Sequence, residues 1–167
     1  GQNNALDDNV DFDVLGNGIP DLEVGWSNQI TLGDYTINAF FRGAFGHSLV
    51  NTFRAFYEPR VGSQKSYNYI NTELANSEIK NANFSSLYVE EADFFKLDNL
   101  TISRPISDNI NLSLNVQNAF VITSYTGSDP EPALFDLLDG NPLAPGIDRR
   151  NSYYSNRSFT LGLNVKF

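Results

Sequence analysis

Apolar and polar residues alternate over several segments of this chain, and this alternation constrains the fold more than any other feature. It is clearest in the segment INLSLNVQNAF (110–120) and in the last eleven residues, RSFTLGLNVKF (157–167). A period of two puts successive side chains on opposite faces of a strand. Both segments are therefore predicted to be strands with one apolar and one polar face. Residues 21–32 and 35–45 follow the same rule, with Asn28 as the exception in the first and Gly43 on the apolar side of the second.

A fifth segment, FFKLDNLTISR (94–104), changes its parity in the middle. Phe95 and Leu97 share one parity, whereas Leu100 and Ile102 share the other. One extra residue in the strand would bring all four onto one face. The sequence therefore predicts a β-bulge near Asn99.

The connections between these segments alternate between short and long. Gly33-Asp34 and Pro105–Asn109 are short enough for hairpin turns, whereas 46–93 and 121–156 are long. Short turns at one rim and long loops at the other are typical of outer-membrane barrels. A soluble β-sandwich would also alternate, but aromatic residues at both ends of the aliphatic bands, such as Phe159 and Phe167, favour the barrel.

Five strands cannot close a barrel, because the smallest single-chain barrels have about eight and an open edge is not tolerated in lipid. The chain also contains no methionine, so Gly1 is not expected to be the natural start. The predicted fold is therefore all-β and antiparallel, with about five strands forming the last part of a larger transmembrane barrel with long extracellular loops.

Composition excludes several classes of function. A formal net charge of −9 argues against a nucleic-acid partner, which needs a basic face. The absence of cysteine excludes a disulfide framework and a thiol nucleophile, and a lone histidine, His47, makes a zinc site improbable. His47 is expected to be an ordinary loop residue. Glu90 and Glu91 are adjacent and are expected to lie in a solvated loop, so no catalytic residues are predicted and the chain is not expected to be an enzyme.

The two faces of the predicted strands have different expected roles. The apolar residues of the last strand are expected to face lipid and to form a signal for barrel assembly: Phe159, Leu161, Leu163, Val165 and Phe167. The opposite parity is expected to face the barrel lumen and includes these residues: Asn38, Arg42, Asn111, Ser113, Asn115, Gln117, Thr160 and Asn164.

Several stretches resemble, in the right order, the C-terminal part of SusC/RagA-type TonB-dependent transporters. They are VEEADFFKLDNLTIS (89–103), NVQNAFVITSYTGSDPE (115–131), FFRGAFG (40–46), GNGIPDLEVGWSN (16–28) and the C-terminus. The resemblance implies a barrel of 22 strands with a plug and a TonB-contacting segment outside this chain. It also implies import of a glycan or peptide oligomer across the outer membrane of a Gram-negative bacterium, with a surface SusD-like lipoprotein as partner.

In that family the C-terminus would lie at the periplasmic rim and the long connections would be extracellular. Residues of these loops are expected to contact the lipoprotein or the ligand: Phe56, Tyr57, Tyr67, Tyr69, Tyr125, Asp129 and Phe135. A calcium ion near Asp7, Asp11 and Asp13 is the only cofactor considered, and a solvated acidic loop is the favoured interpretation there. Two alternatives stay open: a barrel reused as an assembly scaffold, and a soluble carbohydrate-binding module.

Overall fold

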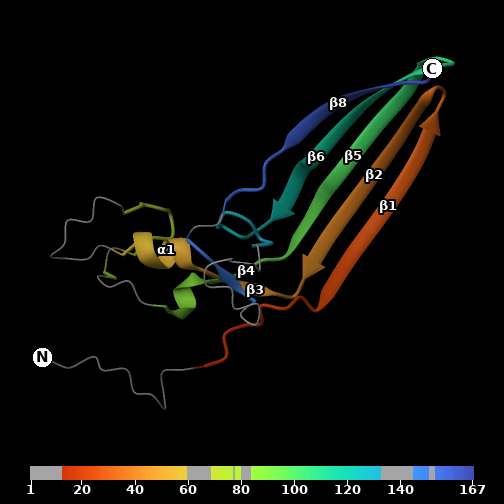
Figure 1. Cartoon of the computed structure of the whole chain (residues 1–167). Helices are drawn as coiled ribbons and strands as arrows, with labels where there is room; N and C mark the ends of the chain where they lie inside the picture. Colours follow the sequence, from red (N-terminus) through yellow and green to blue (C-terminus); the bar gives the residue numbers. More distant parts are fainter. Residues whose placement is uncertain (1–12, 60–68, 77, 80–83, 133–144, 151–152) are drawn as a thin grey trace, which may run out of the picture.

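The computed structural model describes residues 13–59, 69–76, 78–79, 84–132, 145–150 and 153–167. Its main element is a curved antiparallel sheet of five strands (Figure 1). The strands are β1 (Leu22–Leu32), β2 (Tyr35–Phe45), β5 (Phe94–Ser107), β6 (Ile110–Thr123) and β8 (Ser158–Val165), and they lie side by side in this order. The predicted all-β antiparallel fold is confirmed, while the number of strands in the whole barrel stays a prediction.

Two tight turns lie at one end of the sheet, beside the C-terminus (Figure 1). Gly33 turns the chain between β1 and β2 with a φ of 57°, a conformation that glycine adopts without steric cost. The second turn is shorter than predicted: β5 continues through Pro105 to Ser107, with an irregularity in its pairing, and only Asp108 and Asn109 form the turn. The described parts of the long connections lie at the opposite end (Figure 1).

The predicted bulge is present, and its extra residue is Asp98. On the β2 side, the neighbouring residues Phe40 and Phe41 pair with Asn99 and Leu97, so that Asp98 has no partner. On the β6 side the register shifts at the same place, close to Asn118, which has a φ of 49°. The bulge lets β5 keep its apolar side chains on one face of the sheet, although its sequence changes parity.

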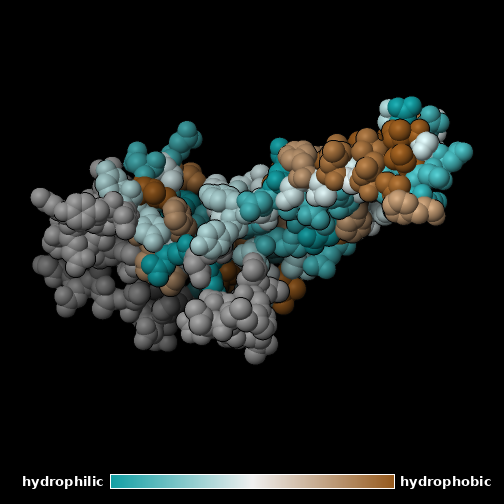
Figure 2. Space-filling view, turned by 45° about the horizontal axis from the view of Figure 1, so that its top comes forward, coloured by the Kyte–Doolittle hydropathy of each residue, from teal (hydrophilic) through white to brown (hydrophobic). Residues whose placement is uncertain are grey.

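The sheet has one apolar and one polar face. Rows of apolar side chains cross all five strands, as in the row Ile30, Ile37, Ile102, Leu114 and Leu161. Closer to the long loops, the rings of Trp26 and Phe41 stack at 5.3 Å, and those of Phe41 and Phe95 stack at 5.6 Å. Figure 2 shows hydrophobic side chains (brown) gathered over the strands beside a polar surface (teal). Leu161 is 74% exposed in this chain, so the apolar face is not covered by the rest of the described residues.

The described parts of the long connections fold into a layer of their own, which the sequence did not predict. It contains β3 (Ser48–Asn51), α1 (Thr52–Tyr57), η1 (Ser86–Tyr88), β4 (Val89–Glu91) and β7 (Ile147–Asp148). β3 is the central strand of a small sheet, antiparallel to β4 and parallel to β7. Leu49, Ala92 and Tyr125 form its buried core. We call this unit the loop layer.

Glycines allow the chain before β1 to pack closely on the loop layer. A Cβ on Gly18 would lie 2.5 Å from the backbone of Gly146, and Ser48 N donates to the carbonyl of Asn17 at 2.8 Å. The GNG stretch at 16–18 thus serves a close backbone contact. Within the described part of the chain, no helix has the length and apolar character needed to cross a membrane.

Candidate functional site

The polar face of the sheet brings the predicted lumen-facing residues together. Asn115 of β6 lies between Thr101 of β5 and Thr160 of β8, and its side-chain amide donates to Asn99 Oδ1 at 3.1 Å and to Thr101 Oγ1 at 2.8 Å. Asn38 pairs with Thr101 from the other side. The remaining residues of the predicted set share this face: Arg42, Asn111, Ser113, Gln117, Thr160 and Asn164. That this face borders a lumen stays a prediction.

A cluster of four charged residues joins the polar face to the loop that follows β6. Arg42 on β2 donates to both carboxylate oxygens of Glu131 at 2.7 and 2.9 Å, and to Asp98 at 3.2 Å. Lys96 on β5 donates to Glu131 at 2.6 Å and lies 3.5 Å from Asp98. Burial acts to raise the pKa of Glu131, but the hydrogen bonds from Arg42 and Lys96 outweigh it and lower the pKa. This cluster fastens the loop to the strands.

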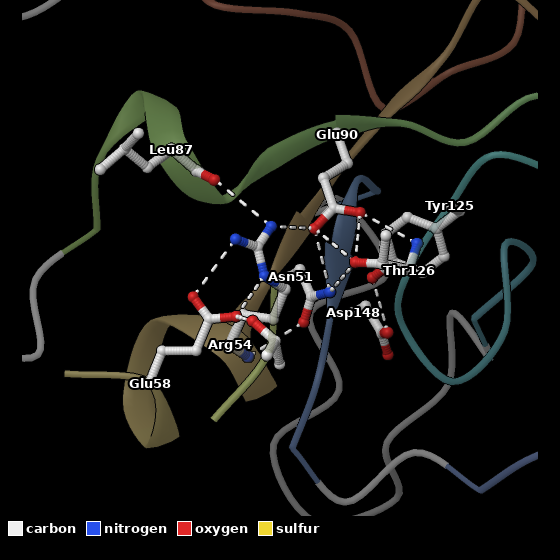
Figure 3. Close-up of polar contacts among 9 residues, drawn as sticks. Asn51, Arg54, Glu58, Leu87, Glu90, Tyr125, Thr126 and Asp148 are labelled. Atoms are coloured by element: carbon white, nitrogen blue, oxygen red, sulfur yellow. Dashed lines mark hydrogen bonds and ion pairs between the residues drawn. The ribbon is translucent and has the colours of Figure 1, made fainter. Parts of the chain in front are cut away.

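A second network holds the loop layer together around Arg54 of α1 (Figure 3). The Arg54 guanidinium donates to Glu58 at 2.6 Å and to Glu90 of β4 at 2.6 Å. The other oxygen of Glu90 accepts the backbone N–H of Thr126 at 2.9 Å, and the Asn51 side chain donates to Glu90 at 3.2 Å. Arg54 and Glu58 are buried and Glu90 is half-buried, and these charge-assisted bonds link three segments that are distant in the sequence.

The expectation that Glu90 lies in a solvated loop is wrong. Burial acts to raise its pKa, but hydrogen bonds from Arg54 and Thr126 prevail and lower the pKa below its usual value. The pairing could not be found from the sequence, because Glu90 lies 36 residues from both partners. Glu91, in contrast, is exposed, as expected.

His47 lies in the connection between β2 and β3, as expected of a loop residue, but it is buried. Its Nε2 lies 3.3 Å from the carbonyl of Pro130, and its ring meets the edge of Phe94 at 6.3 Å. A carbonyl can only accept, so Nε2 carries the proton in this contact. His47 therefore packs the start of the loop layer against the loop after β6.

The predicted loop contacts divide into buried, exposed and undescribed residues. Tyr125 is buried and its hydroxyl donates to Asp148 at 2.7 Å, so the expectation that it contacts a partner or ligand is wrong. Burial, with Asp148 beside it, raises the pKa of Tyr125. Phe56 and Tyr69 are exposed, and Tyr57 packs on the ring of Phe53 at 4.8 Å.

Other predicted residues are held locally or lie outside the described ranges. Asp129 accepts from the backbone N–H of Glu131 at 2.9 Å and from the hydroxyl of Ser155. Tyr67 and Phe135 lie outside the described residues, as do Asp7 and Asp11 of the possible calcium site. Asp13 is described and exposed, and the calcium interpretation stays untested.

The fold is typical of one class of protein. A five-stranded antiparallel sheet with an uncovered apolar face, tight turns at one end and a folded loop layer at the other has the architecture of an outer-membrane barrel wall. Strands β1 and β2 have 11 residues each, which is the length that a tilted strand needs to cross a bilayer.

Comparison with known proteins supports this class. No protein-family profile matches the chain. Two curated relatives from Formosa agariphila match almost all of it: TonB-dependent receptor P3, 25% identical over 95% of the chain, and TonB-dependent receptor P39, 28% identical over 94%. The chain spans 17% of the length of each relative.

Solved structures show the same fold. The RagAB peptide importer in its closed-closed state superimposes with a TM-score of 0.66 at 18% identity, covering 91% of this chain and 18% of the other. Its open-open state gives 0.62 at 17% identity, covering 89% of this chain and 17% of the other. The resemblance to SusC/RagA-type TonB-dependent transporters is therefore confirmed, and this chain aligns with less than a fifth of the length of each of these longer proteins.

Proposed function

We propose that this chain forms part of the barrel wall and the extracellular loops of a TonB-dependent outer-membrane importer. The observation that carries the proposal is the amphipathic five-stranded sheet. Its apolar face is uncovered, as a lipid-facing wall requires, while its polar face carries amides, hydroxyls and the charged cluster around Glu131. The kinship with TonB-dependent receptors adds support.

The remainder of the barrel is the first partner that we propose. Among the described strands, β1 and β8 each pair with one neighbour only, which leaves N–H and C=O groups along two edges. Such groups need partners in lipid. Further strands of the same barrel would supply them, and the plug and the TonB-contacting segment would lie in that part of the receptor.

A surface SusD-like lipoprotein is the second proposed partner, and a peptide or glycan oligomer is the proposed cargo. The loop layer would face outward, with the C-terminus at the periplasmic rim. Support comes from the folded loop layer with its exposed aromatic residues, Phe56 and Tyr69 among them, and from the likeness to RagAB, a peptide importer.

The test combines uptake with cross-linking in cells. The complete receptor is expressed with a photo-cross-linker in place of Phe56 or Tyr69, and with one at Asp34 in the opposite turn as the control. We expect a lipoprotein adduct from the two loop positions alone, and TonB-dependent uptake of labelled oligomers. Correct assembly without any uptake would contradict the import function and favour the alternative in which the barrel serves as an assembly scaffold. A water-soluble product without adducts would contradict the whole proposal.

A further inference from the structure

A cation lies in a row of side chains on the apolar face of the sheet, close to the two tight turns. Thr36 pairs with Ser103 on the polar face, so Tyr35 lies opposite Arg104 on the apolar face. The register continues the row across all five strands: Leu32, Tyr35, Arg104, Leu112 and Leu163. Arg104 is the one charged residue among these five.

The position of the row explains how a charge is tolerated there. Leu32 is the last residue of β1 and Tyr35 is the first residue of β2, so the row lies where the strands meet their turn. On the lipid side of a barrel, a charged side chain is costly at the midplane and tolerated near the membrane interface. If the apolar face meets lipid, Arg104 therefore lies at the depth where acyl chains end and headgroup phosphates begin.

The Arg104 guanidinium is held in place but stays accessible. Its Nη1 donates to the hydroxyl of Tyr35 at 3.3 Å, and its central carbon lies 5.1 Å from the centroid of that ring. The side chain of Arg104 is 46% exposed. Contact with an aromatic ring leaves N–H groups at the edge of a guanidinium, and this planar fork matches two oxygens of a phosphate.

Asp34, in the turn between β1 and β2, supplies a second charge beside Arg104. Its Oδ2 lies 3.7 Å from Arg104 Nη2, which is longer than a hydrogen bond, and its side chain is 69% exposed. An exposed pair at this distance is weak. The carboxylate of Asp34 therefore keeps acceptor positions for a donor from outside the chain.

The order of these groups matches the order of groups in one class of lipid. Along the sheet toward the turn, the apolar rows come first, then Arg104 on its strand, and then Asp34 in the turn. A phospholipid with an ethanolamine headgroup presents acyl chains, then a negative phosphate, and then a positive ammonium with three N–H donors. Each group of such a lipid thus meets a surface of the opposite charge or of like polarity.

We propose that Arg104 and Asp34, with Tyr35 as the support of Arg104, bind the headgroup of phosphatidylethanolamine. Arg104 binds the phosphate and Asp34 binds the ammonium, while the acyl chains lie along the neighbouring apolar rows. This inference rests on the proposed barrel wall and adds the chemistry of a lipid that the wall selects.

The experiment measures lipid binding to the complete receptor, purified in detergent and verified as folded by its heat-dependent gel shift. Bound lipid is quantified by native mass spectrometry with three probes that share their acyl chains. They are phosphatidylethanolamine, phosphatidylcholine, whose ammonium has no N–H, and phosphatidylglycerol, which has no ammonium.

The variants separate the two charges from their surroundings. Arg104→Gln removes the proposed phosphate contact, and Asp34→Asn removes the proposed ammonium contact. Lys166→Gln is the matched control, because Lys166 is exposed at the same end of the sheet but has the parity of Asn164, on the polar face.

We expect the wild type to bind phosphatidylethanolamine more tightly than the other two lipids. Arg104→Gln should lose roughly 10-fold in affinity for it, because a hydrogen bond between charged groups is lost. Asp34→Asn should lose the preference for phosphatidylethanolamine over phosphatidylglycerol, and Lys166→Gln should bind like the wild type.

Equal affinity of the wild type for all three lipids, undiminished binding by Arg104→Gln, or an unchanged preference in Asp34→Asn would each overturn the inference. A folded, detergent-dependent receptor whose variants all bind equally would leave the barrel wall standing without this site. A receptor that stays in solution without detergent and binds no lipid would overturn both. Arginine-dependent lipid binding without TonB-dependent uptake in cells would leave the site standing without import.

Discussion

Arg54 is the residue on which the loop layer depends most. Its guanidinium is the only positive group bound to Glu58 and Glu90 among the described contacts. Arg54→Met would keep much of the side-chain volume but leave two carboxylates without their cation. Removing one partner of a buried ion pair costs about 3–5 kcal/mol. We expect rapid proteolytic cleavage in the loop layer, whereas the exposed control Arg104→Met should be cleaved at the wild-type rate. Equal protection of both variants would contradict this role.

The lowered pKa of Glu90 makes the loop layer sensitive to acid. A carboxylate with a lower pKa in the folded state than its ordinary value of about 4.3 stabilises the fold fully above that value. This stabilisation is lost as the pH falls through the folded-state pKa. Hydrogen exchange at the Thr126 amide, which donates to Glu90, should therefore report constant protection above about pH 5 and a loss of protection below it.

Glu90→Gln provides the control for this titration. The amide keeps the shape of the side chain and does not titrate, so the protection of Thr126 should be weaker and independent of pH. If acid reduces the protection of the Thr126 amide equally in both proteins, another group is responsible for the pH dependence.

At the scale of the elements, the bulge in β5 explains why its sequence breaks the alternation. Without Asp98, strict alternation would put Phe95, Leu97, Leu100 and Ile102 on one face. Deletion of Asp98 should therefore keep these four apolar side chains on one face of the sheet. Deletion of Thr101, three residues away, would put Leu100 and Ile102 on opposite faces.

We expect folded barrel, measured by its heat-dependent gel shift, to persist largely when Asp98 is deleted and to disappear when Thr101 is deleted. The pairing of β2 with β5 becomes regular in the first variant, at the cost of the contacts of Asp98 with Arg42 and Lys96. Equal loss of folded protein in both variants would contradict the assignment of the bulge.

The strands of the large sheet could be predicted from the sequence, whereas the end of β5 and the loop layer could not. The strands, the first turn and the bulge follow from period-two patterning, which is a local property. The end of β5 could not be placed, because Pro105 normally disfavours a strand but is accommodated here next to an irregularity. The loop layer was missed because its strands have only two to four residues and its ion pairs join distant segments. The buried positions of His47 and Tyr125, and the half-buried position of Glu90, depend on the same long-range contacts.

At the scale of the whole molecule, we propose a role in assembly for Phe167. The apolar alternation of β8 continues to Phe167, beside the two tight turns (Figure 1). Among the described strands β8 lies at an edge of the sheet, where unpaired N–H and C=O groups are a template for strand addition, and Phe167 would fix its position at the membrane interface. In the complete receptor, we expect Phe167→Asp to reduce the amount of folded barrel in the outer membrane, and Phe167→Tyr to retain it. Normal assembly of Phe167→Asp would contradict the proposed role of Phe167 in the assembly signal.

The central claim is that the uncovered apolar face of the sheet meets lipid. The chain contains no cysteine, so single cysteines can be placed at each position from 158 to 165 in a cysteine-free complete receptor. After fluorescent labelling in a bilayer, quenching by brominated lipid and by a water-soluble quencher is compared along β8. The account predicts strong lipid quenching at Phe159, Leu161, Leu163 and Val165, and strong aqueous quenching at the positions between them. Aqueous quenching at all eight positions, without a period of two, would contradict a lipid-facing wall.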